Sequence, residues 1–125
     1  MASNLEIVRS FIALWASRDL DAIISKLTED CFYHNMPWAP QTGHAEIRAG
    51  LEPFVASARE IDWVIHHIAE SAEGVVLTER TDRFLLGDTW MEVPVMGTFE
   101  LRDGKIAAWR DYFDSALVNA AMAGG

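Results

Sequence analysis

Residues 78–84 of this chain have the sequence TERTDRF, and residues 109–114 have the sequence WRDYFD. Both stretches alternate like β-strands, on which side chains two positions apart share a face. On this spacing Arg80 and Asp82 share one face, Asp111 lies on another, and apolar residues flank both. Such faces turn inward, and isolated charges are rarely buried. We therefore expect the three charged side chains to pair with one another or to take part in chemistry. The flanking apolar residues are Val76, Phe84, Trp109 and Phe113.

The charge of this cluster predicts an acid beside a base. With both carboxylates ionised, Arg80, Asp82 and Asp111 carry one net negative charge; with one proton bound, they are neutral. A low-dielectric interior penalises net charge, so burial favours keeping the proton. An unperturbed aspartate titrates near ~3.9, and desolvation and mutual repulsion raise the value of one of the two. We predict one protonated and one ionised aspartate near neutral pH, the arrangement of paired general acid and base catalysis.

A structural role is the alternative for these charges. A buried ion triad could simply fix strand register, although buried ion pairs stabilise little compared with apolar replacements. Structural ion networks also perturb pKa values, so the spacing alone leaves both interpretations open. Tyr33 and Asn35 share a face of an earlier predicted strand, and both could hydrogen-bond a water molecule. Each taken alone also fits an ordinary role, as a core tyrosine and as an asparagine beside a turn.

Length and composition limit the class of protein. The 125 residues are expected to form one domain, residues 1–125, and half of them are hydrophobic, which allows a sizeable core or pocket. A net charge of −9 argues against nucleic acids and anionic membranes as partners. The lone Cys31 excludes an internal disulfide and favours a cytoplasmic location. No apolar run reaches the roughly 20 residues of a membrane span.

The histidines and glycines do not indicate a metal or cofactor site. His66 and His67 are adjacent on a predicted strand, so they face opposite ways, and His34 and His44 add no metal-ligand spacing. The sequence has no glycine-rich phosphate loop and no G-x-S-x-G nucleophile elbow. We expect neither a metal nor a cofactor.

Apolar spacing is helical in the first part of the chain. Ser3 and Glu6 form a capping box for one helix, and Asp19 caps a second helix whose apolar face extends to Leu27. A third helix is predicted around residues 47–55, which Pro53 should kink or divide because proline donates no backbone hydrogen bond.

From residue 61 onward the spacing alternates, which predicts an antiparallel meander. Gly87-Asp88 predicts a hairpin, and Pro94 and Gly97 suggest a bulge or bend. A short helix is predicted in the tail that follows Asp114, fraying toward Gly124 and Gly125. Helices segregated from antiparallel strands give an α+β fold, here a curved sheet over helices. The predicted strands, including one before the third helix, are residues 29–36, 61–70, 75–86, 89–101 and 106–113.

Three separate motifs resemble the limonene-1,2-epoxide hydrolase family. They are the Tyr-x-Asn element at residues 33–35, LTERTD at residues 77–82 and GKIAAWRDYFD at residues 104–114. The resemblance runs over nearly the whole chain. It implies an NTF2-like, or SnoaL-like, cone: a strongly curved mixed sheet, mostly antiparallel, with three to four helices around a deep apolar pocket. It also implies a homodimer and no cofactor.

The same resemblance implies a role for each polar residue. Asp111 would be the general base that takes a proton from water, and Tyr33 and Asn35 would hold that water. Asp82 would be the general acid that protonates the epoxide oxygen, and Arg80 would orient both aspartates. The implied reaction is one-step hydrolysis of a hydrophobic, cyclic or terpenoid-like epoxide to a vicinal diol. Candidate substrate-pocket residues are Ile12, Trp15, Phe54, Phe84, Val93, Val95, Trp109 and Phe113.

Other functions remain open at the level of the sequence. A covalent route through an aspartyl ester is a mechanistic rival. An isomerase or cyclase of the same fold, ketosteroid isomerase-like or polyketide cyclase-like, could also use an aspartate and a tyrosine over an apolar pocket. A non-catalytic small-molecule binder is a third possibility. An arginine between two carboxylates favours the hydrolase, because the isomerase and cyclase chemistries do not need one.

Overall fold

The computed structural model of this chain describes residues 2–124. The helices are α1 (Asn4–Leu14), η1 (Trp15–Ser17, a 3₁₀ turn), α2 (Leu20–Ser25), α3 (Gly43–Ser57) and α4 (Ser115–Gly124). The strands are β1 (Leu27–Asn35), β2 (Gln41–Thr42), β3 (Glu60–Glu70), β4 (Val76–Leu86), β5 (Thr89–Arg102) and β6 (Lys105–Tyr112). The predicted α+β class is confirmed. Over residues 2–124, the helices all fall short of the length and apolar character that a membrane span requires.

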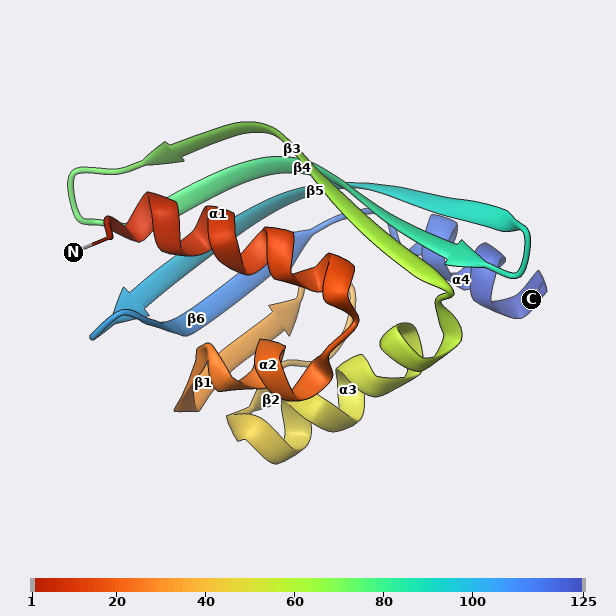
Figure 1. Cartoon of the computed structure of the whole chain (residues 1–125), viewed down its shortest axis with the longest axis horizontal. Helices are drawn as coiled ribbons and strands as arrows, with labels where there is room; N and C mark the ends of the chain where they lie inside the picture. The colour runs from red at the N-terminus through yellow and green to blue at the C-terminus, as the bar shows by residue number, and fades with distance from the viewer. Residues whose placement is uncertain (1, 125) are drawn as a thin grey trace.

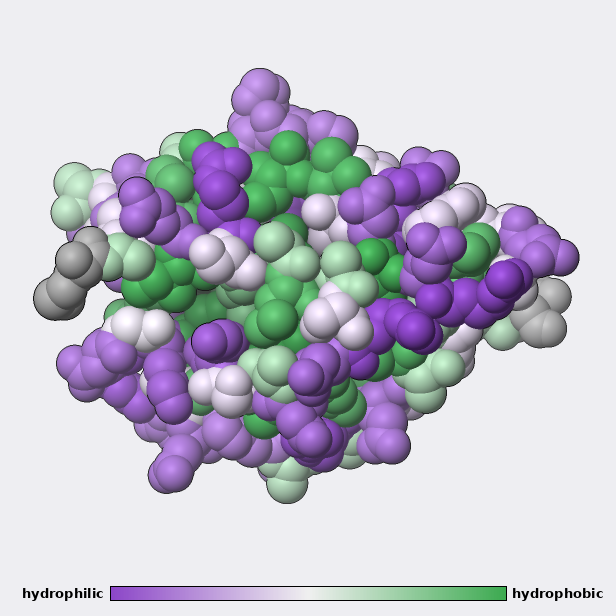
Figure 2. All heavy atoms as spheres, in the orientation of Figure 1, coloured by the Kyte–Doolittle hydropathy of each residue, from purple (hydrophilic) through white to green (hydrophobic). Residues whose placement is uncertain are grey.

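The six strands form one mixed sheet in the order β2-β1-β6-β5-β4-β3. Strands β3 to β6 form the predicted antiparallel meander. Strand β1 pairs in parallel with β6, so the first strand of the chain lies beside the last. Figure 1 shows the sheet curled without closing, with α1 lying along it and α2 and α3 beside β1. Hydrophilic side chains are spread over the face seen in Figure 2, with hydrophobic groups between them.

Side-chain caps start the first two helices. Ser3 Oγ accepts a hydrogen bond from the Glu6 backbone N–H at 3.2 Å, and Asp19 Oδ1 accepts one from the Ala22 N–H at 3.1 Å. Both predicted starts are therefore confirmed. The predicted extension of the second helix to Leu27 is wrong, because Leu27 begins β1 and pairs with Ile106 of β6.

Pro53 does not divide the third helix. Helix α3 is continuous from Gly43 to Ser57, although Pro53 cannot donate to the carbonyl one turn earlier. Apolar side chains are buried on both sides of the proline, Leu51 before it and Val55 after it. Burial of this face offsets the single missing backbone hydrogen bond, so the helix continues.

Of the bulge or bend predicted at Pro94 and Gly97, the bulge is absent from the pairing with β4. The β4–β5 register is unbroken over the whole pairing, and the irregularity in β5 lies between Glu100 and Leu101, against β6. The short strand β2 is absent from the predicted strands. The predicted tail helix is present as α4, and Gly125 lies outside the described residues.

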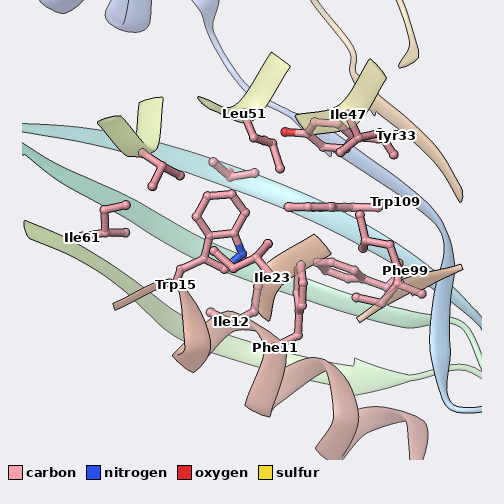
Figure 3. Packing of buried hydrophobic residues seen from close by; sticks show 14 of the residues in the cluster. Phe11, Ile12, Trp15, Ile23, Tyr33, Ile47, Leu51, Ile61, Phe99 and Trp109 are labelled. Atoms are coloured by element: carbon pink, nitrogen blue, oxygen red, sulfur yellow. The ribbon is translucent and has the colours of Figure 1, made fainter. Parts of the chain in front are cut away.

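An aromatic core fixes β6 against α1. Phe11 of α1 meets the Trp109 ring edge-on at 5.2 Å between centroids, and Trp109 stacks on Phe99 of β5 at 5.4 Å. Tyr33 of β1 covers the other side of Trp109 at 4.4 Å (Figure 3). Trp109 and Phe99 are fully buried. This packing holds β1, β5 and β6 in one position relative to one another, which sets the geometry of the polar residues beside them.

Candidate active site

Four neighbouring strands bring Thr78, Gly97, Asp111 and Asn35 into one row. Thr78 of β4 pairs with Gly97 of β5, and Gly97 pairs with Asp111 of β6. Asp111 in turn pairs with Asn35 of β1, and its backbone carbonyl accepts a hydrogen bond from Met36 at 2.9 Å. The parallel β1–β6 pairing therefore places the early Tyr-x-Asn element directly beside Asp111.

Arg80 connects the two aspartates. Its Nε and Nη2 donate to the two carboxylate oxygens of Asp82, both at 2.9 Å. Its Nη1 and Nη2 donate to the two carboxylate oxygens of Asp111, at 3.2 and 2.9 Å. The Arg80 side chain is 0 % exposed, so its charge is neutralised entirely by its neighbours. The structure thus assembles the three charged side chains that the strand spacing singled out.

Gly97 creates the path by which Arg80 reaches Asp111. Asp111 lies two strands away from Arg80, with β5 between them. A Cβ on residue 97 would overlap both Nη1 of Arg80 and Oδ1 of Asp111. The hydrogen of glycine therefore leaves the space that the guanidinium occupies. From the sequence, Gly97 indicated only a bulge or a bend. Its position two residues after Val95, on the inward face, was the signal that could have found this role.

Two further residues orient this cluster, and the sequence predicted a polar role for neither of them. Thr78 Oγ1 accepts a hydrogen bond from Arg80 Nη1 at 3.0 Å and donates to the Gly97 carbonyl at 3.3 Å. The indole Nε1–H of Trp109 donates to Oδ1 of Asp111 at 2.8 Å. Both residues lie two positions from a residue of the cluster on the same strand face, which is the signal that could have found them.

Burial and charge set the protonation of the cluster. Desolvation raises the pKa of Asp82 to about 6, against the opposing effect of the Arg80 charge, and the Asp111 charge adds to the rise. For Arg80, burial acts to lower the pKa, but the charges of Asp111 and Asp82 outweigh it and raise the value above its usual range. The arginine therefore stays charged, while Asp82 can hold a proton in mildly acidic solution.

Tyr33 and Asn35 form a hydrogen-bonded pair next to the aspartates. The Tyr33 hydroxyl donates to Oδ1 of Asn35 at 3.0 Å. Burial, reinforced by the Asp111 charge, raises the pKa of Tyr33 above its usual value. The tyrosine therefore remains a neutral hydroxyl, whose oxygen can still accept one hydrogen bond.

These polar groups lie at one cavity. It encloses about 480 Å³ of empty space, counting its open mouth. Its polar side chains, apart from the indole groups of three tryptophans, are Tyr33, Asn35, Asp82 and Asp111. Its apolar lining consists of Trp15, Trp38, Leu51, Phe54, Trp63, Phe84, Met91, Val93, Val95, Phe113 and Val118.

Six of the eight apolar residues expected at a pocket line this cavity, and two do not. Ile12 and Trp109 are buried in the core beneath it. Trp38, which lies in a proline-bounded loop, and Val118, which belongs to an alanine-rich helix, were not expected at the pocket. Trp63 was also missed, although it shares the inward face of its strand with Ile61 and alternation could have found it.

The described residues contain no cluster of side chains suited to bind a metal ion. Across residues 2–124, no three His, Cys, Asp or Glu side chains gather closely enough to ligate one. Asp82 and Asp111 are already engaged by Arg80.

Comparison with known proteins gives the family. The limonene-1,2-epoxide hydrolase catalytic domain matches residues 2–123. Epoxide hydrolase EphG of Mycobacterium tuberculosis is 35 % identical over 113 residues, which are 86 % of this chain and 70 % of that protein. The structure of an M. tuberculosis LEH-like epoxide hydrolase aligns with a TM-score of 0.79 and 29 % identity, covering 98 % of this chain and 90 % of that one.

More distant structures share the fold alone. A putative isomerase from Bacillus subtilis aligns with a TM-score of 0.82 at 21 % identity, covering 96 % of this chain and 92 % of its own. SalBIII, an epoxide hydrolase/cyclase-like enzyme in pyran ring formation, aligns with a TM-score of 0.80 at 21 % identity, covering 90 % and 92 %. The expected NTF2-like architecture is confirmed by such neighbours. The family match over residues 2–123 and the identity to EphG place this chain in the limonene-1,2-epoxide hydrolase family.

Proposed function

We propose that this protein is an epoxide hydrolase that adds water to a hydrophobic epoxide and releases a vicinal diol. The observation that carries the proposal is the buried Asp82–Arg80–Asp111 bridge at the wall of an apolar cavity. Membership of the limonene-1,2-epoxide hydrolase family supports epoxide hydrolysis in general. The proposal needs no cofactor.

The mechanism follows from two carboxylates in different protonation states. Asp111, ionised, takes a proton from a water molecule held by the Tyr33 hydroxyl and Asn35. The water oxygen attacks one ring carbon, the carbon–oxygen bond breaks, and Asp82 gives its proton to the departing oxygen. Each proton transfer contributes on the order of 10²–10⁴-fold. The pair ends with its proton on Asp111, and exchange with solvent restores the starting state.

The cavity lining supports a hydrophobic, cyclic or terpenoid-like substrate. Apolar side chains surround the four polar residues, so a ligand buries hydrocarbon surface while presenting one oxygen to Asp82. A charged group on the ligand would be desolvated without a partner, which disfavours ionic substrates.

Diol formation from a panel of cyclic and aromatic epoxides tests the activity. Wild-type protein should form diol, and kcat/KM should fall as the pH rises through about 6, where Asp82 loses its proton. Asp82→Asn and Asp111→Asn should each reduce turnover by at least about 100-fold while the protein stays folded. Turnover of an enone or a polyketide with no epoxide hydrolysis would instead indicate an isomerase or a cyclase. Ligand binding without any turnover would indicate a binding protein.

A single turnover in ¹⁸O-labelled water distinguishes one-step hydrolysis from a covalent route. Direct attack by water puts the label into the diol in the first turnover. A covalent aspartyl ester would release an unlabelled diol first, because its oxygen comes from the carboxylate. An unlabelled first product would contradict the proposed mechanism.

We also propose that the protein acts as a homodimer in the cytoplasm. Met96 and Tyr112 are paired on neighbouring strands and are 52 % and 48 % exposed, and Leu77 is exposed as well. These large apolar side chains on the outside of the sheet fit a self-associating face. The lone cysteine, Cys31, is buried and agrees with a reducing compartment.

A further inference from the structure

Arg80 donates the same number of hydrogen bonds to each of the two aspartates. The guanidinium donates two hydrogen bonds to Asp82 and two to Asp111. Their side chains are also buried to a similar degree, 8 % and 4 % exposed. Neither the arginine nor burial explains why Asp82, rather than Asp111, would hold the shared proton. Indeed, the slightly deeper burial of Asp111 would favour the opposite distribution.

Trp109 is the group that makes the pair unequal. Its indole N–H donates to Oδ1 of Asp111 at 2.8 Å, so Asp111 accepts three hydrogen bonds and Asp82 accepts two. An indole N–H can only donate, and it therefore favours the ionised carboxylate. The ring is 0 % exposed and is held between Tyr33 and Phe99, so the donor cannot turn away (Figure 3).

We propose that Trp109 is a positioning residue whose indole N–H keeps Asp111 ionised and leaves the shared proton on Asp82. This assigns the base and the acid from geometry, and its catalytic consequence rests on the proposed hydrolase function. Among residues 2–124, the other titratable or charged groups against the pair are Arg80, which donates two hydrogen bonds to each aspartate, and Tyr33, whose hydroxyl donates to Asn35. Trp109 lies outside the cavity lining, so it acts through Asp111 and does not touch the substrate.

Carboxyl ¹³C NMR on protein labelled at the aspartate side-chain carbons tests this directly. Single Asp82→Asn and Asp111→Asn variants assign the two resonances. In wild type at about pH 5, Asp82 should show the protonated shift and Asp111 the carboxylate shift. A wild type in which Asp111 carries the proton would overturn the proposal, and this measurement needs no variant of Trp109.

The decisive variant replaces Trp109 by β-(3-benzothienyl)alanine, in which sulfur replaces the N–H with nearly the same shape. The protonated fraction of Asp111 should then rise about tenfold, because one charge-assisted hydrogen bond is lost. Trp15 provides the matched control: its Nε1 is buried and has no hydrogen-bond partner within the described residues, so the same replacement there should leave both resonances unchanged. Unchanged titration in the Trp109 variant would overturn the proposal.

Kinetics separate this role from a merely structural one. If the protein hydrolyses epoxides, the Trp109 replacement should lower kcat about tenfold with KM unchanged, and it should alter the pH profile. Trp109→Phe, which also removes the N–H, should shift the NMR titration in the same direction, and its unfolding curve reports any loss of packing. The NMR result stands even if no epoxide is turned over, so failure of the proposed function would be recognised separately.

Discussion

Arg80 makes five hydrogen bonds with its guanidinium, and none of them is to water-exposed groups. A buried arginine with two carboxylates would be a costly way to stabilise a sheet, because desolvation consumes most of the Coulomb attraction. A site that needs two carboxylates at a fixed distance, with a single proton between them, would account for this desolvation cost. The residues that support the cluster, Thr78, Gly97 and Trp109, then serve to hold this geometry.

The protonation of Asp82 should appear in the stability of the protein. Desolvation raises its pKa to about 6 in the folded state, against 3.8 for an unperturbed aspartate, so the folded protein binds this proton more tightly than the unfolded chain. The resulting stabilisation is complete below about pH 4 and is lost as the pH rises through about 6. Urea unfolding from pH 4 to 8 should show wild type losing on the order of 3 kcal/mol more than Asp82→Asn. Parallel stability curves for the two proteins would contradict this assignment.

Gly97→Ala should disrupt the bridge. The added Cβ would occupy the space between Arg80 and Asp111, so those hydrogen bonds are lost and a buried charge is left without its partner. We expect a loss of about 3–5 kcal/mol in the free energy of unfolding and a loss of hydrolysis.

Thr98→Ala, on the next position of β5 but on its other face, is the matched control and should change stability by less than about 1 kcal/mol. A Gly97→Ala variant as stable as this control would show that Arg80 reaches Asp111 by another path.

At the scale of elements, the pairing of β1 with β6 decides what the site contains. A parallel pair needs a long connection, here the whole chain between the first and last strands. The pairing places Asn35 opposite Asp111 and Tyr33 opposite Trp109. Without it, the hydroxyl and amide that could hold a water molecule would be far from the aspartates.

Helix α3 offers a test of how packing overrides local propensity. Pro53 is exposed and interrupts one backbone hydrogen bond in the helix interior. Pro53→Ala restores the donor, and we expect it to raise the free energy of unfolding by about 1–2 kcal/mol, since the helical penalty of proline exceeds its benefit in the unfolded chain. Glu52→Ala, at the adjacent exposed position, should be close to neutral. Destabilisation by Pro53→Ala would mean that a bend at the proline is needed to seat Phe54 and Val55.

At the scale of the whole molecule, the outside of the sheet should determine oligomeric state. Met96 pairs with Tyr112 on this face, and a carboxylate in the middle of an apolar interface would be desolvated without a partner. Met96→Glu should therefore convert a dimer to a monomer, measured by light scattering after size-exclusion chromatography.

Leu117→Glu, at an exposed position of α4, is the control and should leave the mass unchanged. A wild type that is already monomeric at micromolar concentration would contradict the proposed homodimer.

The sequence by itself determined most of the local elements and which charged side chains face inward. Alternation placed Arg80, Asp82 and Asp111 on inward faces, and caps at Ser3 and Asp19 marked helix starts, because these features depend on neighbours a few residues apart. The three motifs also gave the family, which the comparisons confirmed.

Only the tertiary structure decided that β1 lies beside β6, which completes the order β4-β5-β6-β1. The hairpins of the meander follow from local turn signals, but this parallel pairing joins distant segments, which no local pattern encodes. The strand order also explains the glycine at position 97. Arg80 of β4 and Asp111 of β6 contact each other across β5, in the space that a side chain on residue 97 would fill. Trp109 was expected in the pocket wall, but it lies in the core and donates a hydrogen bond to Asp111. The direction of its indole N–H is set by packing on both faces of the ring.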